Sequence, residues 1–372
     1  MEGEEDILQK HHQHRLIIDE GPPPETRSST FDDADDKQPP PPAKTKRVAS
    51  LDIFRGLTVA MMVLVDGAGG EWPAIGHAPW EGCNLADFVM PFFLFIVGMA
   101  VPLSLKRIPN RLLAAKRVVL TFKDREAHFL GSSFARVDMQ QIRRCGILQR
   151  IALAYLIVAL LEISTKNTQS ESQSHTTSSI FKSYLWQWSA GACILIVYLA
   201  MLYDMYVPNW EFTVHNSNSK DYGKVLTVAC GVRGQLDPPC NAVGHIDRTV
   251  LGINHMYHHP AWRRTKACTD VSPHEGPIRV DAPSWCQAPF EPEGILSSIS
   301  SIMTTIIGVH FGHVLVHIKD HTQRLRHWVL MGFALLISEI ILHFTSAIPL
   351  NKQLYSFSWC SGACILQLLH SC

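Results

Sequence analysis

The stretch SLDIFRGLTVAMMVLVDGAGGEWPAIGHAPWEGCNLADFVMPFFLFIVG, from Ser50 to Gly98, places a short polar hairpin between two apolar segments. The apolar segments are Ile53–Val65 and Leu85–Val101, and the hairpin between them carries His77. An ionisable side chain at the centre of a membrane helix costs about 2.5–3.5 kcal/mol on insertion scales, so such groups are retained mainly where chemistry or transport uses them. The pattern predicts a membrane protein with a functional site at this hairpin.

Further apolar segments extend this membrane prediction along the chain. Runs of about 17–25 apolar residues predict membrane helices. Hydropathy alone rejects the short stretch Asn110–Phe122, because Lys123-Asp124-Arg125-Glu126 interrupts it. We expect an all-α polytopic membrane bundle with about seven or eight spans. The good candidates are Ile53–Gly70, Leu85–Leu105, Ile147–Ile163, Trp186–Tyr203, Ile295–Ile318 and Trp328–Phe344, and a weaker one is Leu354–Leu369.

The basic residues predict which side each loop faces. Lys44, Lys46 and Arg47 precede the first span, which places the N-terminus in the cytoplasm. The hairpin holds no Lys or Arg, so it is expected on the opposite side. The basic clusters at 106–117 and 319–326 are both expected in the cytoplasm. If Asn110–Phe122 does not cross, the number of spans between the two clusters places them on opposite sides of the membrane. Either that stretch crosses, or the downstream half is inverted; we favour a poor crossing.

The chain divides into four parts by composition. Residues 1–49 contain acidic and proline runs without the apolar core of a signal peptide, which predicts a disordered cytoplasmic tail. Residues 50–203 hold the N-terminal transmembrane helices with the hairpin, 204–294 form a long luminal loop, and 295–372 hold the C-terminal transmembrane helices. The loop contains Cys230, Cys240, Cys268 and Cys286, and this even number predicts disulfides. Pairing of Cys230 with Cys240 is favoured, but the sequence leaves the connectivity open.

Composition also excludes several classes of function. The formal net charge is zero, so no basic footprint indicates nucleic-acid binding. The chain contains no phosphate-binding P-loop, GxGxxG or GxSxG motif, so hydrolase and nucleotide-binding folds have no support.

The hairpin and the start of the next span supply the first candidate site residues. The imidazole of His77, in IGHAPWEG, could act as a general base or carry an acyl group. Alternatively, it is an interfacial histidine packed beside Trp72 and Trp80. Asp87 lies about one turn inside the next span, where it either hydrogen-bonds the imidazole or caps the helix after Asn84.

Asp66 and Arg150 are further candidates near the ends of spans. Asp66 ends the first span and could assist His77. Arg150, in GILQRIALAY, could pair with Asp66 or Asp87, or hold a phosphate or carboxylate group of a ligand. The alternative for Arg150 is an arginine that extends its charge to the membrane interface.

Two other histidine clusters have alternative interpretations. The first, in NHMYHHP, has plausible zinc spacing but no accompanying carboxylate or cysteine pattern, so packing within the loop is favoured. The second recurs at i, i+3 and i+7 on one helical face, where it either lines a polar path or flanks the interface. The clusters are His255, His258 and His259, and His310, His313 and His317.

Five motifs together resemble a known family. They are SLDIFRG (50–56), GHAPWEG with LADFVMPFFLFIVG (76–98), GILQRIALAY (146–155), GHIDR (244–248) and EPEGIL (291–296). Over roughly residues 47 to 357 the chain resembles the transmembrane N-acetyltransferases typified by heparan-alpha-glucosaminide N-acetyltransferase. No single motif identifies this family, but the order of the five motifs along the chain is specific for it.

The resemblance implies transfer of an acetyl group from cytoplasmic acetyl-CoA to an amine, such as a terminal glucosamine, on the luminal side. His77 matches the family's active histidine, acting as a covalent carrier or as a base, and Asp87 would orient it. Arg150 is then expected to bind the co-substrate. Asp66 stands where the family has asparagine, and an ionised carboxylate cannot donate to an oxyanion. The resemblance also implies an endomembrane location, lysosomal or vacuole-like, with the plasma membrane as the alternative. Contact with membrane lipid follows, and a homo-oligomer is left open.

The chain also departs from the family pattern. KDREAHFLGSSFAR interrupts the expected third span, and the chain stops at Cys372 where relatives continue. We therefore expect a truncated or alternatively spliced member. Two rival functions follow: a small-solute transporter that uses the His310 face, and an inactive truncated product.

Overall fold

The computed structural model describes residues 49–82, 84–106, 110, 112–121, 123, 143, 145–165, 181–182, 184–214, 221–344, 351 and 353–355. The predicted tail and most of the weak terminal span lie outside the described residues.

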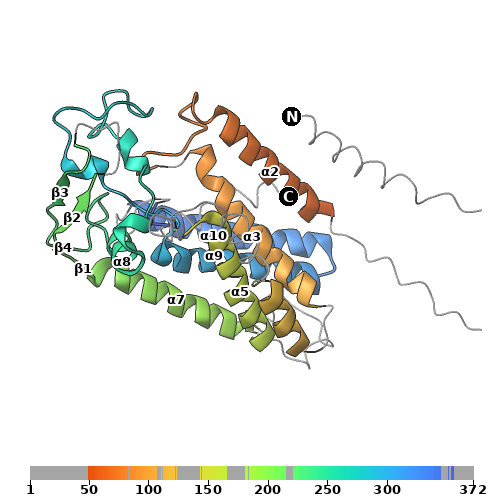
Figure 1. Cartoon of the computed structure of the whole chain (residues 1–372). Helices are drawn as coiled ribbons and strands as arrows, with labels where there is room; N and C mark the ends of the chain where they lie inside the picture. Colours follow the sequence, from red (N-terminus) through yellow and green to blue (C-terminus); the bar gives the residue numbers. More distant parts are fainter. Residues whose placement is uncertain are drawn as a thin grey trace, which may run out of the picture. The chain divides into compact units, whose positions relative to one another are not determined.

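Long helices make up most of the described chain (Figure 1). Residues 112–121 are also helical. The helices are α2 (Ala49–Ala68), α3 (Leu85–Leu105), α5 (Ile147–Thr165), α7 (Leu185–Asp204), α8 (Ala242–Leu251), α9 (Ile295–His317) and α10 (His321–Phe344), with short 3-10 turns η2 (Ile253–His255), η3 (Ala261–Arg264) and η4 (Ser284–Gln287).

Four of the described helices are long and apolar enough to cross a membrane: α3, α5, α7 and α9. Their bounds agree closely with four of the predicted spans. Helix α2 has a comparable length but carries Asp52, Arg55 and Asp66. The fold is therefore that of a helical membrane protein, and the count of seven or eight spans stays a prediction.

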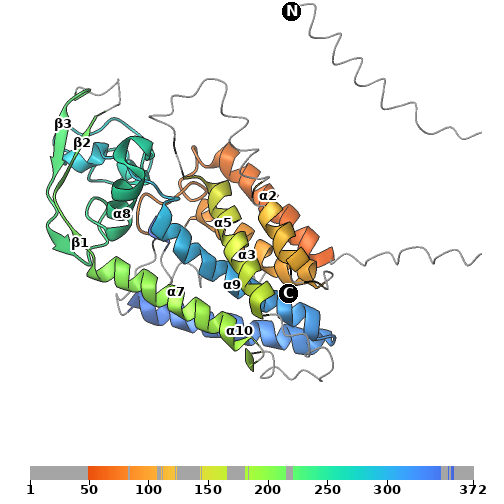
Figure 2. The ribbon, with the colours of Figure 1, turned by 60° about the horizontal axis from the view of Figure 1, so that its bottom comes forward.

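Helix α9 lies at the centre of the bundle, between α3 and α5 on one side and α7 and α10 on the other (Figure 2). Nearly all of its side chains are buried. Its glycines let α3 approach closely: a Cβ added to Gly308 would lie 2.5 Å from the carbonyl oxygen of Phe95, and one added to Gly312 would lie 2.7 Å from that of Met99. This spacing is the GxxxG pattern that brings membrane helices into backbone contact.

The chain returns to the His77 end of the bundle between residues 106 and 143. Helix α3 starts beside His77 and, with 21 residues, ends about 31 Å away at Leu105. Ile147, at the start of α5, lines the same cavity as His77. In between, Ala114 and Val118 of the helical stretch 112–121 are buried in the core with residues of α3 and α5. This stretch overlaps Asn110–Phe122, where the charge pattern favours a membrane crossing although hydropathy rejects one.

The described residues of the segment 204–294, called the 204–294 domain below, hold the described strands and two disulfides. Strand β1 (Tyr206–Val207) pairs antiparallel with β4 (Val232–Arg233), and β2 (Trp210–Thr213) with β3 (Val225–Val228). The bonds Cys230–Cys240 and Cys268–Cys286 confirm the predicted disulfides and give the connectivity. The all-α expectation thus describes the bundle, and the predicted loop adds two small sheets.

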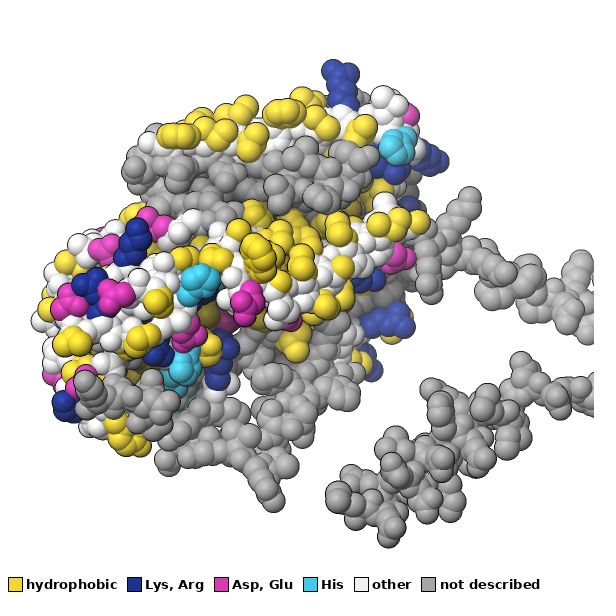
Figure 3. Space-filling model, turned by 90° about the horizontal axis from the view of Figure 1, so that it is seen from above, with side chains coloured by type: hydrophobic (Ala, Val, Ile, Leu, Met, Phe, Trp, Pro, Cys, Tyr) yellow, Lys and Arg dark blue, Asp and Glu magenta, His cyan; other side chains and the backbone are white. Residues whose placement is uncertain are grey.

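The surface divides between the bundle and this domain. Charged and histidine side chains are spread over the end that carries the strands, hydrophobic side chains cover much of the helices, and basic side chains also lie at the opposite end (Figure 3). On helix α2, for example, the side chains of Ile53, Val63 and Leu64 are exposed. Such a band is expected where helices face lipid.

Candidate active site

The hairpin that carries His77 is held by backbone contacts. Gly69 and Gly76 approach so closely that a Cβ on Gly76 would collide with the carbonyl oxygen of Gly69. The carbonyls of Ala74 and Ile75 accept hydrogen bonds from the first amides of α3, at Leu85 (3.2 Å) and Ala86 (3.0 Å). These amides have no partner within the helix, so the hairpin satisfies them and is fixed to the start of α3.

Asp87 joins His77 to this helix start. Its Oδ1 lies 2.7 Å from Nδ1 of His77. Its Oδ2 accepts the backbone N–H groups of Ala78 and Asn84, each at 3.1 Å. The carboxylate is fully buried, whereas the imidazole is 44% exposed. Both roles considered for Asp87, helix capping and histidine orientation, therefore occur together.

This contact selects the tautomer of His77. An ionised carboxylate only accepts hydrogen bonds, so the neutral imidazole carries its proton on Nδ1. The lone pair then lies on Nε2, on the opposite side of the ring from Asp87. This arrangement suits a general base or a nucleophile, because the carboxylate also stabilises the imidazolium that forms.

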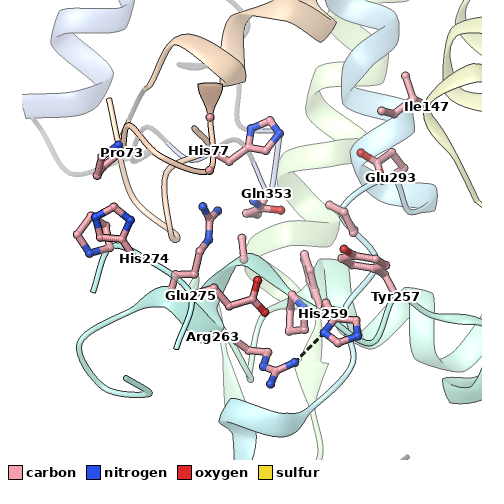
Figure 4. Close-up of a pocket in the computed structure, with 18 of the residues that line it drawn as sticks. Pro73, His77, Ile147, Tyr257, His259, Arg263, His274, Glu275, Glu293 and Gln353 are labelled. Atoms are coloured by element: carbon pink, nitrogen blue, oxygen red, sulfur yellow. Dashed lines mark hydrogen bonds between the residues drawn. The ribbon is translucent and has the colours of Figure 1, made fainter. Parts of the chain in front are cut away.

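The imidazole borders a cavity of about 410 Å³. Figure 4 shows His77 on one side and His259, Arg263 and Glu275 on the other. The hairpin, the start of α5, the loop before α9 and residue 353 complete the wall. The lining residues are Gly69, Gly70, Pro73, His77, Arg143, Ile147, Tyr257, His259, Pro260, Ala261, Arg263, Arg264, Pro273, His274, Glu275, Phe290, Pro292, Glu293 and Gln353.

Arg143 is a wall residue that sequence reasoning missed. It donates hydrogen bonds to Glu291 and Glu293, and its guanidinium lies 4.9 Å from the ring centroid of Tyr257. Burial lowers the pKa of Arg143, but its bonds to the two carboxylates outweigh this and raise that pKa above its usual value. The EPEG motif (291–294), which precedes α9, thus binds this arginine. Its two carboxylates beside a predicted span were the available signal in the sequence.

Comparison with known proteins bears on this site. The chain is 28% identical over 340 residues to heparan-alpha-glucosaminide N-acetyltransferase from Mus musculus. The matched region covers 85% of this chain and 47% of that protein. The corresponding protein from Homo sapiens is 27% identical over 332 residues, with 84% and 46% covered. The chain is therefore similar in sequence to the heparan-alpha-glucosaminide N-acetyltransferases. This confirms the resemblance drawn from the motifs.

The match has a defined extent. The chain spans about half the length of these two curated relatives. No family model matches it. Both relatives are named N-acetyltransferases.

Two predicted site residues lie apart from the His77–Asp87 pair. Asp66 is exposed near the end of α2 and, within the described part of the chain, makes no hydrogen bond or ion pair. Arg150 is buried, donates to the carbonyl of Pro292 and to Ser297 Oγ, and lies over the ring of Tyr355. Its described contacts join α5 to the start of α9, and a role in binding co-substrate stays a prediction.

The two tryptophans of the hairpin differ in environment. Trp72 is 66% exposed, as expected for an interfacial residue, whereas Trp80 is buried. The indole of Trp80 donates to the carbonyl of Leu236 and packs against Trp262 and Phe290, with ring centroids 5.5 and 5.7 Å away. Trp80 therefore attaches the hairpin to the 204–294 domain.

The histidines of α9 have partners inside the bundle. His313 Nε2 lies 3.0 Å from Glu162 Oε2, and His310 Nε2 lies 3.0 Å from His327 Nε2. His317 contacts the hydroxyl of Tyr184 at 2.9 Å. These contacts join α9 to α5, α7 and α10, and a transport path along this face stays a prediction.

The other histidine cluster does not form a metal site within the described residues. There, no three His, Cys, Asp or Glu side chains are placed to hold one metal ion. His259 instead lies 2.8 Å from Arg263.

Proposed function

We propose that the chain binds acetyl-CoA and transfers its acetyl group to the amine of an amino-sugar acceptor in the His77 cavity. The observation that carries the proposal is the His77–Asp87 pair at the wall of that cavity. The two N-acetyltransferase relatives supply the reaction class.

The pair can act as a general base. His77 Nε2 takes a proton from the ammonium form of the acceptor, and the freed amine attacks the thioester carbonyl. The imidazolium passes this first proton to solvent, and Nε2 then takes the second proton from the nitrogen that has attacked. The carbon–sulfur bond breaks, and the leaving CoA thiolate takes that second proton from the imidazolium. Asp87 stabilises the imidazolium between these steps.

The same pair can act as a nucleophile. Nε2 then attacks the thioester and displaces CoA, and the acceptor amine removes the acetyl group from the imidazole. A rapid acid quench after mixing with labelled acetyl-CoA alone separates the two routes, because only the second labels the protein.

The location of the cavity supports an acceptor on the side opposite the cytoplasm. The hairpin lacks basic residues and packs through Trp80 against the disulfide-bonded domain. Disulfides form in luminal or extracellular compartments. We therefore place acetyl-CoA supply in the cytoplasm, the acceptor in the lumen and the protein in an endomembrane, lysosomal or vacuole-like.

Acetylation by the purified full chain tests the proposal. The protein in detergent is mixed with radiolabelled acetyl-CoA and glucosamine, beside His77→Ala and the control His274→Ala, which removes another histidine of the cavity wall. We expect labelled N-acetylglucosamine from the unaltered chain and the control, and a loss of about 100-fold or more in His77→Ala. Equal rates in all three would exclude His77, and an inactive unaltered chain would favour the inactive-product alternative.

A further inference from the structure

Two arginines face the cavity without a carboxylate partner. Arg263 and Arg264 are half-buried in the cavity wall, and neither forms an ion pair within the described part of the chain. Arg143 differs, because Glu291 and Glu293 neutralise it. Glu275 also lines the cavity, but it makes no described ion pair with either arginine.

The hydrogen bond of Arg263 leaves its charge in place. Its Nη1 lies 2.8 Å from Nδ1 of His259. A guanidinium can only donate, so His259 accepts through Nδ1 and is neutral in this arrangement. The bond orients the guanidinium without neutralising it.

The two arginines are held at a fixed position relative to His77. They end η3, whose Trp262 is fully buried. Trp262 packs against Trp80, three residues after His77, and against Phe290, with ring centroids 5.5 and 5.0 Å away. The aromatic contact therefore couples the arginine turn to the hairpin that carries the imidazole.

We propose that Arg263 and Arg264 form an anion subsite that binds a carboxylate or sulfate of the acceptor while its amine lies at His77. This inference rests on the proposed function. Arginine binds carboxylates and tetrahedral oxyanions through paired, charge-assisted hydrogen bonds, which suits an anionic group better than a neutral sugar. The two arginines then determine acceptor specificity, and the chemistry stays at His77.

Acceptor preference tests the subsite. Kinetics of the full chain in detergent compare glucosamine with glucosamine 6-sulfate, for the unaltered chain, the double variant Arg263→Gln with Arg264→Gln, and the control Arg279→Gln. Arg279 belongs to the same domain but pairs with Asp281 on the surface. We expect the double variant to lose at least about tenfold in kcat/KM for the sulfated amine, because a hydrogen bond to a charged group contributes about 1.5–3 kcal/mol. Its kcat/KM for glucosamine stays within about twofold, and the control changes neither.

Other outcomes overturn the inference. Equal losses for both amines would show that the arginines do not select an anionic acceptor, and a lowered melting temperature beside them would make the arginines structural. A raised KM for acetyl-CoA alone would assign the anion to the phosphates of the donor. If the unaltered chain acetylates neither amine, the proposed function fails, and calorimetry of glucosamine 6-sulfate binding then tests the subsite by itself. Weaker binding in the double variant than in the unaltered chain supports the subsite. Equal binding in both, or no binding to either, contradicts it.

Discussion

Asp87 couples the chemistry of the site to its architecture. One carboxylate oxygen contacts His77, and the other accepts the backbone amides of Ala78 in the hairpin and of Asn84, which caps the start of α3. The buried carboxylate therefore fixes both the tautomer of the imidazole and the hairpin that carries it. Such coupling is typical of catalytic histidines, which are oriented by a hydrogen bond to the nitrogen away from the substrate.

Substitution Asp87→Asn should separate these two roles. The amide keeps an acceptor oxygen but cannot stabilise an imidazolium, so we expect kcat to fall by about 100-fold or more with little change in melting temperature. Steady-state acetylation of glucosamine measures this, with Glu81→Gln, an exposed change in the same hairpin, as control. An unchanged kcat in Asp87→Asn would remove the pair from the mechanism.

Asp247 should make stability depend on pH. Its Oδ1 accepts the amide of Ile295 at the start of α9, and burial raises the pKa of this carboxyl to about 7. This pKa exceeds that of the same carboxyl in the unfolded chain. The stability that Asp247 contributes is therefore fully present below about pH 4 and is lost as the pH rises through about 7. We expect the melting temperature to fall over this window and Asp247→Asn to flatten the fall, since asparagine keeps the acceptor without a charge. The exposed change Asp281→Asn is the control, and parallel pH curves for the unaltered chain and Asp247→Asn would refute the assignment.

At the scale of elements, the close crossing of α3 and α9 organises the bundle. Their backbones meet at Gly98, Gly308 and Gly312. A side chain at Gly308 must push α3 away, and overpacking of this kind typically costs about 1–3 kcal/mol. We expect Gly308→Leu to lower the melting temperature and the acetylation rate together. Gly56→Leu is the matched control, because nothing lies within 4 Å of a Cβ at that helical glycine. Equal melting temperatures for the two variants would contradict the crossing.

The sequence predicts some of these elements better than others. The apolar runs predict α3, α5, α7 and α9, because hydrocarbon requires length and hydrophobicity. The even number of cysteines predicts the two disulfides. Local patterns do not reveal that Arg143 binds Glu291 and Glu293, about 150 residues later in the chain, because such contacts depend on tertiary packing. The same limit applies to Arg263 and Arg264, which resemble any surface basic pair until Trp262 places them beside the hairpin.

At the scale of the whole molecule, the site lies where the bundle meets the disulfide-bonded domain. The hairpin, the start of α5 and the 204–294 domain all contribute to one cavity at one end of the helices. The basic residues expected in the cytoplasm lie around 319–326, beyond the opposite end of α9. We therefore predict that the membrane separates the acetyl donor from the acceptor.

Acetyl transfer in sealed proteoliposomes tests this claim most directly. Vesicles holding uniformly oriented protein, with the 204–294 domain inside, are loaded with glucosamine, and radiolabelled acetyl-CoA is added outside. We predict that labelled N-acetylglucosamine accumulates inside with the unaltered chain and not with His77→Ala. Product that forms only when both substrates are on the same side, or equal accumulation with His77→Ala, would contradict the account.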